Sequence, residues 1–230
     1  MRLEEQSEKF PICNQLMLLK DDEPVKLNRH GLLLPDSIRA LICGTSGSGK
    51  TNLMVCLLLQ SNGLKFTNVY ICSRSIQQDK YIYLENIFKL VPEIGYFTID
   101  NAQQIPNNAE PNSIIIFDDI SMDEQENIRK YFSMGRHKQI DCFYLCQSYA
   151  KIPKHLVRDN ANFIILFEQD ELNLRHVYSD HISSPNISFD KFKQMCNICW
   201  QNRHGFLTID KTRDMHNGRF RKDLDTFIYI

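Results

Sequence analysis

Short apolar runs alternate with longer amphipathic stretches along this chain from residue 37 onwards. The runs carry Ile, Val, Phe or Tyr almost without polar interruption and span 38–43, 68–72, 113–117, 141–146 and 162–167. Strands that are buried on both faces of a parallel sheet have this composition. Helical character is found at 49–60, at 76–90 and at 121–134, where Ser121 is the candidate N-cap. The alternation predicts an α/β sheet whose crossover connections are right-handed.

The two ends of the chain depart from this alternation. Residues 1–36 contain mixed charges and three prolines, and they predict an irregular lead-in that packs on or flanks the core. After residue 167 we expect helices at 170–182 and 188–201, a short strand at 205–209 and a basic tail. We interpret these as additions to the same fold, so that 37–230 form one domain.

Composition limits the class of protein. Of the 230 residues, 43% are hydrophobic and 24% are charged, which excludes disorder and coiled coil as the main state. The net charge of -1 is far from that of a protein that coats nucleic acid, so such a partner must meet a local basic patch. The longest fully apolar run has seven residues, and most cysteines lie in apolar runs. We therefore expect an intracellular protein with reduced thiols and no membrane segment.

A phosphate-binding loop follows the first predicted strand. The sequence GTSGSGKT fits the pattern G-x-x-x-x-G-K-[ST], and its residues are Gly44, Thr45, Ser46, Gly47, Ser48, Gly49, Lys50 and Thr51. Glycines allow successive N–H groups to point at one phosphate, and the following helix N-terminus adds partial positive charge. Lys50 is expected to reach the β- and γ-phosphates of the nucleotide, and the Thr51 hydroxyl to bind Mg²⁺.

Two acids end the predicted strand at 113–117. The sequence IIIFDD is typical of a Walker B strand, whose first acid, Asp118, is expected to hold Mg²⁺. Asp119 would then orient or deprotonate the water that attacks the γ-phosphate. Switch GTPases and small kinases usually lack the second acid, so the pair favours ATP hydrolysis. Two solvated acids at a strand end are the simpler alternative.

Polar and basic residues surround the next strand, at 141–146. Gln147 follows it and is the candidate sensor of the γ-phosphate, or simply a residue that ends a strand. Residues 129–158 contain seven basic residues and one acid, hence a net charge of +6. An arginine donated by a neighbouring subunit can stabilise the transition state. Arg136 is the first candidate for this role and Arg158 the second.

Other residues attract chemical interest but are interpreted as structural. Cys196 and Cys199, with His204 nearby, resemble half of a zinc site, and a second ligand pair is missing. Six aromatic residues fall at spacings that suit a core, and we expect them to pack rather than to stack on bases: Phe66, Tyr70, Tyr81, Tyr83, Phe132 and Tyr144.

Four separated segments resemble one family. They are GTSGSGKTN, IIIFDD, the run from Tyr131 to Phe167, and the tail from Gly205 to Ile228. Together they are similar to poxvirus-type genome-packaging ATPases of the FtsK/HerA superfamily, especially those of Polinton/Maverick-type elements and related viruses. The resemblance implies an α/β P-loop NTPase of the ASCE/RecA-like kind, with a mainly parallel sheet and flanking helices.

The resemblance also implies a function. The expected activity is Mg²⁺-dependent ATP hydrolysis that moves double-stranded DNA into a preformed capsid, by a homo-oligomeric ring of five or six subunits. Lys50, Thr51, Asp118, Asp119 and Gln147 take the roles given above, and Arg136 acts in trans. The second acid of this superfamily is often Glu, which is longer than Asp119 by one methylene. The protein is expected in the host nucleus or cytoplasm and transiently at the capsid, in contact with capsid proteins.

Two other functions stay open. A nucleotide kinase has a similar phosphate loop but needs an acceptor pocket and usually arginine-rich lid residues. A nucleotide-dependent assembly or binding module, such as a domesticated copy without packaging activity, would bind ATP without moving DNA. A GTP-binding module is disfavoured because no N-K-x-D segment follows the loop.

Overall fold

The computed structural model of the protein describes residues 2–5, 7, 29–100, 104–106, 109–120, 125–183 and 187–230. Most of the predicted lead-in and the predicted N-cap, Ser121, lie outside these residues. The chain divides into two compact units. Unit 1 contains 1–10, 39–50 and 145–230, and unit 2 contains 11–38 and 51–144.

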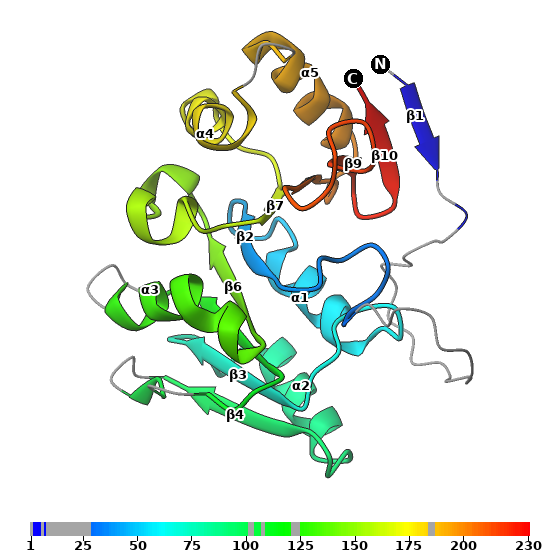
Figure 1. Ribbon diagram of the computed structural model, residues 1–230. Coiled ribbons are helices and arrows are strands. Elements are labelled where there is room, and N and C mark those ends of the chain that lie inside the picture. The colour runs from blue at the N-terminus through cyan, green and yellow to red at the C-terminus, as the bar shows by residue number, and fades with distance from the viewer. Residues whose placement is uncertain are drawn as a thin grey trace. The chain divides into compact units, whose positions relative to one another are not determined.

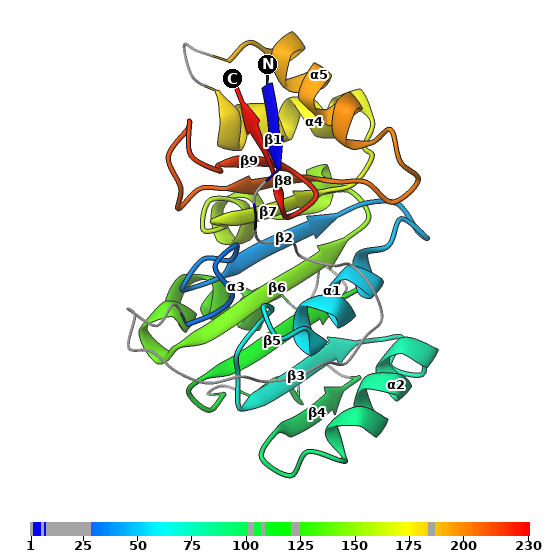
Figure 2. The same ribbon diagram turned by 90° about the vertical axis from the view of Figure 1, so that its right-hand side faces the viewer.

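Unit 2 contains parallel strands with helices on both faces. Its strands follow the order β6-β5-β3-β4, and β3 pairs in parallel with both β5 and β4. Helices α1 and α2 lie on one face of these strands and α3 on the other (Figures 1 and 2). The bounds are β3 (Asn68–Ser73), β4 (Gly95–Ile99), β5 (Ser113–Asp118), β6 (Ile140–Cys146), α1 (Lys50–Leu59), α2 (Asp79–Phe88) and α3 (Gln125–Met134).

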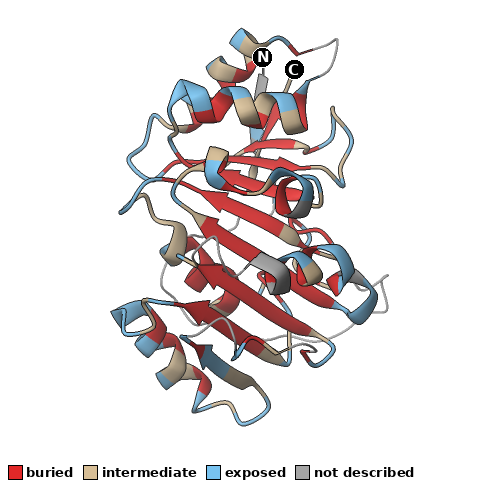
Figure 3. Cartoon of the chain, turned by 90° about the vertical axis from the view of Figure 1, so that its left-hand side faces the viewer, coloured by how far each residue is buried: buried red, intermediate tan, exposed pale blue. Residues whose placement is uncertain are grey.

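The apolar runs of unit 2 account for its core. All six residues of β5 are buried, and Figure 3 shows buried residues along the strands and exposed ones on the outer sides of the helices. Helix α1 is apolar around most of its circumference, and the six residues from Leu53 to Leu58 are all buried. A helix with this pattern belongs inside a protein rather than on its surface.

Unit 1 joins a parallel pair of strands to an antiparallel extension. Its strand order is β2-β7-β8-β9-β10-β1, in which β2 and β7 are parallel and every later pair is antiparallel. Figure 1 shows β1 beside β10, although they come from opposite ends of the chain. The bounds are β1 (Arg2–Glu5), β2 (Arg39–Cys43), β7 (Phe163–Leu166), β8 (Leu207–Asp210), β9 (Phe220–Lys222), β10 (Thr226–Tyr229), α4 (Glu171–Val177) and α5 (Phe189–Cys199).

Short turns of helix complete the description. They are the 3-10 helices η3 (Gly135–Lys138) and η4 (Tyr149–Lys151) and the π-helices η5 (Lys154–Arg158) and η6 (Tyr178–Ile182). Within the ranges that the structure describes, every helix is too short or too polar to cross a lipid bilayer.

The predicted α/β class is confirmed, and each of the five apolar runs is a strand to within one residue at either end. The short strand expected at 205–209 is β8, which begins at Leu207. The prediction for the chain ends was incomplete. Residues 2–5 form a strand rather than irregular structure, and the basic tail folds into β9 and β10. The buried charge of Arg221 in this tail has a partner, because its Nη2 lies 2.6 Å from Oδ2 of the equally buried Asp210.

Candidate nucleotide-binding site

The phosphate loop of unit 1 has a backbone that only glycine adopts readily. Gly47 has φ of 76° and Gly49 has φ of 115°, both in the region that L-residues avoid. At Gly44 the limit is space, because a Cβ atom there would lie 2.5 Å from Ser48 Oγ and 2.7 Å from Phe167 Cβ. The glycines of the sequence motif therefore occupy the positions where a side chain would be strained or blocked.

Lys50 lies against the loop that precedes it. Its Nζ donates hydrogen bonds to the main-chain oxygens of Gly44 at 2.6 Å and of Thr45 at 2.9 Å. The ammonium group is thus held beside the main chain of the loop. In this motif the lysine ammonium binds the phosphates from this position beside the loop.

Gln147 lies close to the start of the same loop. The main-chain N–H of Gly44 donates to the oxygen of Cys146 at 3.1 Å, so the end of β6 runs beside the end of β2 within unit 1. Gln147 is the next residue and is exposed. Gln147 thus follows directly on a residue that is hydrogen-bonded to the first residue of the loop, and its role as a sensor stays a prediction.

His204 contacts the phosphate loop as well, which the sequence does not indicate. Its Nδ1 lies 3.0 Å from the main-chain oxygen of Ser48. The other two members of the half zinc site, Cys196 and Cys199, are both buried. Burial raises the pKa of the Cys199 thiol to about 12, which favours its neutral form.

In unit 2, the two predicted magnesium ligands, Thr51 and Asp118, are both hydrogen-bonded to the hydroxyl of one tyrosine. The hydroxyl of Tyr81 donates a hydrogen bond to Oδ2 of Asp118, and the side chain of Thr51 is a hydrogen-bond partner of the same hydroxyl. Burial and the Asp118 carboxylate raise the pKa of Tyr81, and the bond from Thr51 lowers it. Hydroxyl and carboxylate oxygens are the ligands that Mg²⁺ prefers, so Thr51 and Asp118 fit such an ion.

The two consecutive acids have different environments. Asp118 ends β5 and is 6% exposed, whereas Asp119 is exposed. Asp119 also has φ of 54°, a left-handed conformation that is uncommon outside glycine and concentrated at functional sites. A buried acid held by a hydrogen bond and an exposed acid in a left-handed conformation agree with separate roles for the two carboxylates.

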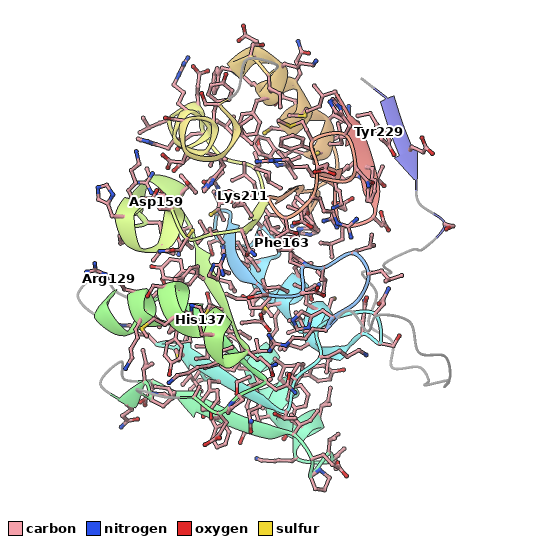
Figure 4. All side chains as sticks on the ribbon, viewed as in Figure 1. Arg129, His137, Asp159, Phe163, Lys211 and Tyr229 are labelled. Atoms are coloured by element: carbon pink, nitrogen blue, oxygen red, sulfur yellow. The ribbon has the colours of Figure 1, made fainter. Side chains whose placement is uncertain are left out.

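The two candidate arginines differ in what the structure shows. Arg136 belongs to η3, and its side chain lies outside the described residues. Two exposed residues near Arg136 in the sequence are labelled in Figure 4: Arg129 on α3 and His137 in η3. In unit 1, Arg158 is 8% exposed. Its Nη1 donates to Oδ2 of Asp180 at 2.8 Å, and its guanidinium lies 5.1 Å from the centre of the Tyr149 ring. Arg158 is therefore engaged inside its own unit.

Comparison with known proteins places these features in a family and a fold. The model of the family described as poxvirus A32 protein matches residues 25–202. No curated protein sequence matches the chain.

Several solved structures have a similar fold. The genome packaging NTPase B204 from Sulfolobus turreted icosahedral virus 2, in complex with AMP, has a TM-score of 0.54 and 14% identity, covering 81% of this chain and 96% of B204. B204, the DNA-packaging ATPase from Sulfolobus turreted icosahedral virus, has a TM-score of 0.53 and 15% identity, covering 80% and 95%. The cytoplasmic domain of the type VII secretion ATPase EccC from Thermomonospora curvata has a TM-score of 0.51 and 12% identity, covering 88% and 25%. At these identities the similarity establishes the P-loop NTPase fold.

Proposed function

Because the chain belongs to the poxvirus A32 protein family, we propose that it is an ATPase that packages viral DNA. The observation that carries the proposal is the glycine-rich loop with Lys50 against it, inside the segment that matches the family. The names of the similar structures support it, since B204 is described as a genome packaging NTPase and was solved with AMP, AMPPCP and ATP-γS.

Each site residue has a proposed role in ATP hydrolysis. The N–H groups of residues 44–49 and the Lys50 ammonium bind the phosphates, and Thr51 and Asp118 hold Mg²⁺, directly or through water. When bound, the ion neutralises charge on the β- and γ-phosphate oxygens. Asp119 accepts a hydrogen bond from the attacking water and orients it. Gln147 detects whether the γ-phosphate is present.

The coupling of this chemistry to DNA is a further part of the proposal. We propose a homo-oligomeric ring in which Arg136 of one subunit reaches the nucleotide of the next and stabilises charge in the transition state. The ion pair of Arg158 with Asp180 supports the choice of Arg136. In this proposal the phosphates of double-stranded DNA contact exposed basic side chains such as Arg129 and Lys138. The ring also binds to capsid proteins.

ATP turnover with and without duplex DNA tests the proposed function. Wild-type protein should hydrolyse ATP and do so faster with DNA. The Lys50→Ala variant should lose about a hundredfold or more in rate, because the cation that faces the phosphates is removed. Lys89→Ala is the matched control, because Lys89 is exposed and pairs across one turn of α2 with Glu85. Wild-type turnover by Lys50→Ala would contradict the site assignment.

The same assay separates the two alternatives. Transfer of phosphate to an added nucleoside or nucleotide, in place of water, would favour a kinase. ATP binding with no effect of DNA on turnover would favour an assembly or binding module.

A further inference from the structure

Burial and main-chain hydrogen bonds fix the position of Tyr81. The side chain is 1% exposed and stands in the first turn of α2. Its main-chain oxygen accepts a hydrogen bond from the Tyr96 hydroxyl at 3.1 Å. Its main-chain N–H donates to the oxygen of Gln78 at 2.9 Å. With its backbone held in this way, the phenol hydroxyl has a defined position between Thr51 and Asp118.

The hydrogen-bonding capacity of the phenol decides which of these three side chains donates and which accepts in each hydrogen bond. A tyrosine hydroxyl has one proton to donate and lone pairs that accept. The proton goes to Oδ2 of Asp118, so the hydroxyl oxygen of Tyr81 accepts from Thr51. The proton of the Thr51 hydroxyl therefore points at Tyr81. A hydroxyl that binds a cation must present a lone pair to the ion and donate its own hydrogen bond elsewhere, and here the Tyr81 oxygen accepts that hydrogen bond.

We propose that Tyr81 is a positioning residue for the magnesium-binding pair of Thr51 and Asp118. Its oxygen accepts a hydrogen bond from the Thr51 hydroxyl, which leaves the lone pairs of that hydroxyl for the metal, and its own hydrogen bond fixes the rotation of the Asp118 carboxylate through one oxygen. The inference rests on the proposed MgATP site and adds a residue that neither sequence motif contains.

The chain offers a matched control in the same unit. Tyr131 is also buried, at 4% exposure, and its hydroxyl also has two partners. It donates to the main-chain oxygen of Pro106 and accepts from the N–H of Ala109. Both partners are main-chain groups outside the two motifs. Tyr131→Phe thus removes the same atom from a comparable environment without touching a metal ligand.

Binding of a fluorescent, slowly hydrolysed ATP analogue, titrated with Mg²⁺, tests the proposal without using turnover. For Tyr81→Phe the Mg²⁺ concentration at half-maximal binding should rise about tenfold, as is typical when a partner of a metal ligand is removed. Binding in EDTA should not change. Tyr131→Phe should lower the unfolding temperature and leave the Mg²⁺ titration as in wild type.

A second measurement asks whether Tyr81 acts through Thr51. The shift caused by Thr51→Ala and the shift caused by Tyr81→Phe should not add in the double variant, because both remove one link of the same chain. Should Tyr81→Phe be recovered unfolded, Tyr81→Met, whose flexible side chain also lacks a hydroxyl, carries the same expectation.

The outcomes separate this inference from the proposed function. A wild-type titration for folded Tyr81→Phe, or an equal shift for Tyr131→Phe, would overturn the role of Tyr81 alone. Wild-type protein whose analogue binding does not respond to Mg²⁺ would overturn the proposed MgATP site, and with it the inference.

Discussion

Gly47 and Gly49 both have positive φ, but they lie in different parts of that region. Gly47, at 76°, is close to the left-handed helical conformation, and a Cβ atom added there would have no neighbour within 4 Å among the described residues. Gly49, at 115°, is in a region that residues with a Cβ hardly visit, and Phe167 would lie 3.5 Å away. The two positions therefore make a matched pair for substitution by alanine.

We predict that Gly49→Ala destabilises the protein more than Gly47→Ala does. The cost should be about 1 kcal/mol at Gly47, the usual penalty for a left-handed L-residue. At Gly49 it should be about 3 kcal/mol, the upper end for a strained backbone. Denaturant unfolding gives both values, and ATP affinity should fall in the same order. Equal costs would mean that the loop does not hold the backbone described here.

The chemical residues are predictable to the extent that they belong to local motifs. Lys50 and Thr51 are identified by their neighbours in the glycine-rich sequence, and Asp118 by the strand that it ends. Tyr81 is 37 positions from Asp118, and His204 is 156 positions from Ser48, so their contacts depend on tertiary packing. The spacing of Tyr81 fits an apolar helix face and predicts a core residue. Tyr81 is indeed buried in the core, but the spacing could not reveal the hydrogen-bond partners of its hydroxyl.

At the scale of elements, η4, η5 and η6 of unit 1 are joined by a buried polar cluster. Tyr149 donates to Oδ2 of Asp180 at 3.0 Å, and its oxygen lies 2.7 Å from Nε2 of His181. Nδ1 of His181 lies 3.3 Å from Nζ of Lys211. The histidine is satisfied as the neutral form with its proton on Nε2, because a second proton on Nδ1 would face the Lys211 ammonium.

This cluster predicts a stability that falls as the pH falls. Burial and then Lys211 lower the pKa of His181 from its ordinary 6.5 to about 4. The unfolded chain thus takes up a proton below pH 6.5 that the folded protein resists until about pH 4. Between pH 7 and 5 the free energy of unfolding should drop by on the order of 2 kcal/mol through this residue. Denaturant unfolding at several pH values measures the drop.

Two variants isolate the contribution of His181 from that of other groups. His181→Gln should be less stable at pH 7 but should lose less stability between pH 7 and 5 than wild type does. His155→Gln should keep the wild-type slope, because the His155 side chain is 86% exposed. A His181→Gln slope equal to that of wild type would contradict the assignment of the pH dependence to this cluster.

The elements can be predicted wherever burial makes a strand continuously apolar. That holds for β2, β3, β5, β6 and β7. It fails for β4, whose residues 95–98 are exposed or half-buried. It also fails for β9, whose Arg221 is buried. Its guanidinium donates to the main-chain oxygens of Gly218 and Leu224 and to the carboxylate of Asp210. From sequence alone Arg221 is indistinguishable from a solvated arginine, because its ion-pair partner, Asp210, lies on another strand.

For the molecule as a whole, the family and the fold could be predicted because separated motifs occur in the right order. The family match over 25–202 and the α/β architecture confirm both. The strand predicted at 205–209 corresponds to β8, whereas β9, β10 and β1 are not predicted. Strands β1 and β10 come from opposite chain ends and pair only after folding. Assembly is a property of several copies and stays a prediction.

The proposed ring makes a specific prediction about mixed subunits. Arg136→Ala protein should bind nucleotide but lose turnover by about a thousandfold, because the transition-state cation is missing. Asp119→Asn protein should be inactive for a different reason, the loss of the carboxylate that orients water. In an equal mixture, about a quarter of the head-to-tail interfaces pair an intact Arg136 with an intact Asp119, so hydrolysis should return in part.

The matched control mixes Lys50→Ala with Asp119→Asn subunits. Lys50 and Asp119 must belong to the same subunit to serve one nucleotide, so no interface in this mixture has a complete site and turnover should stay absent. Rescue in the first mixture and none in the second would assign Arg136 to the neighbouring site. If neither mixture is active, while Arg136→Ala and Asp119→Asn each still bind nucleotide and assemble, Arg136 does not act across a subunit boundary.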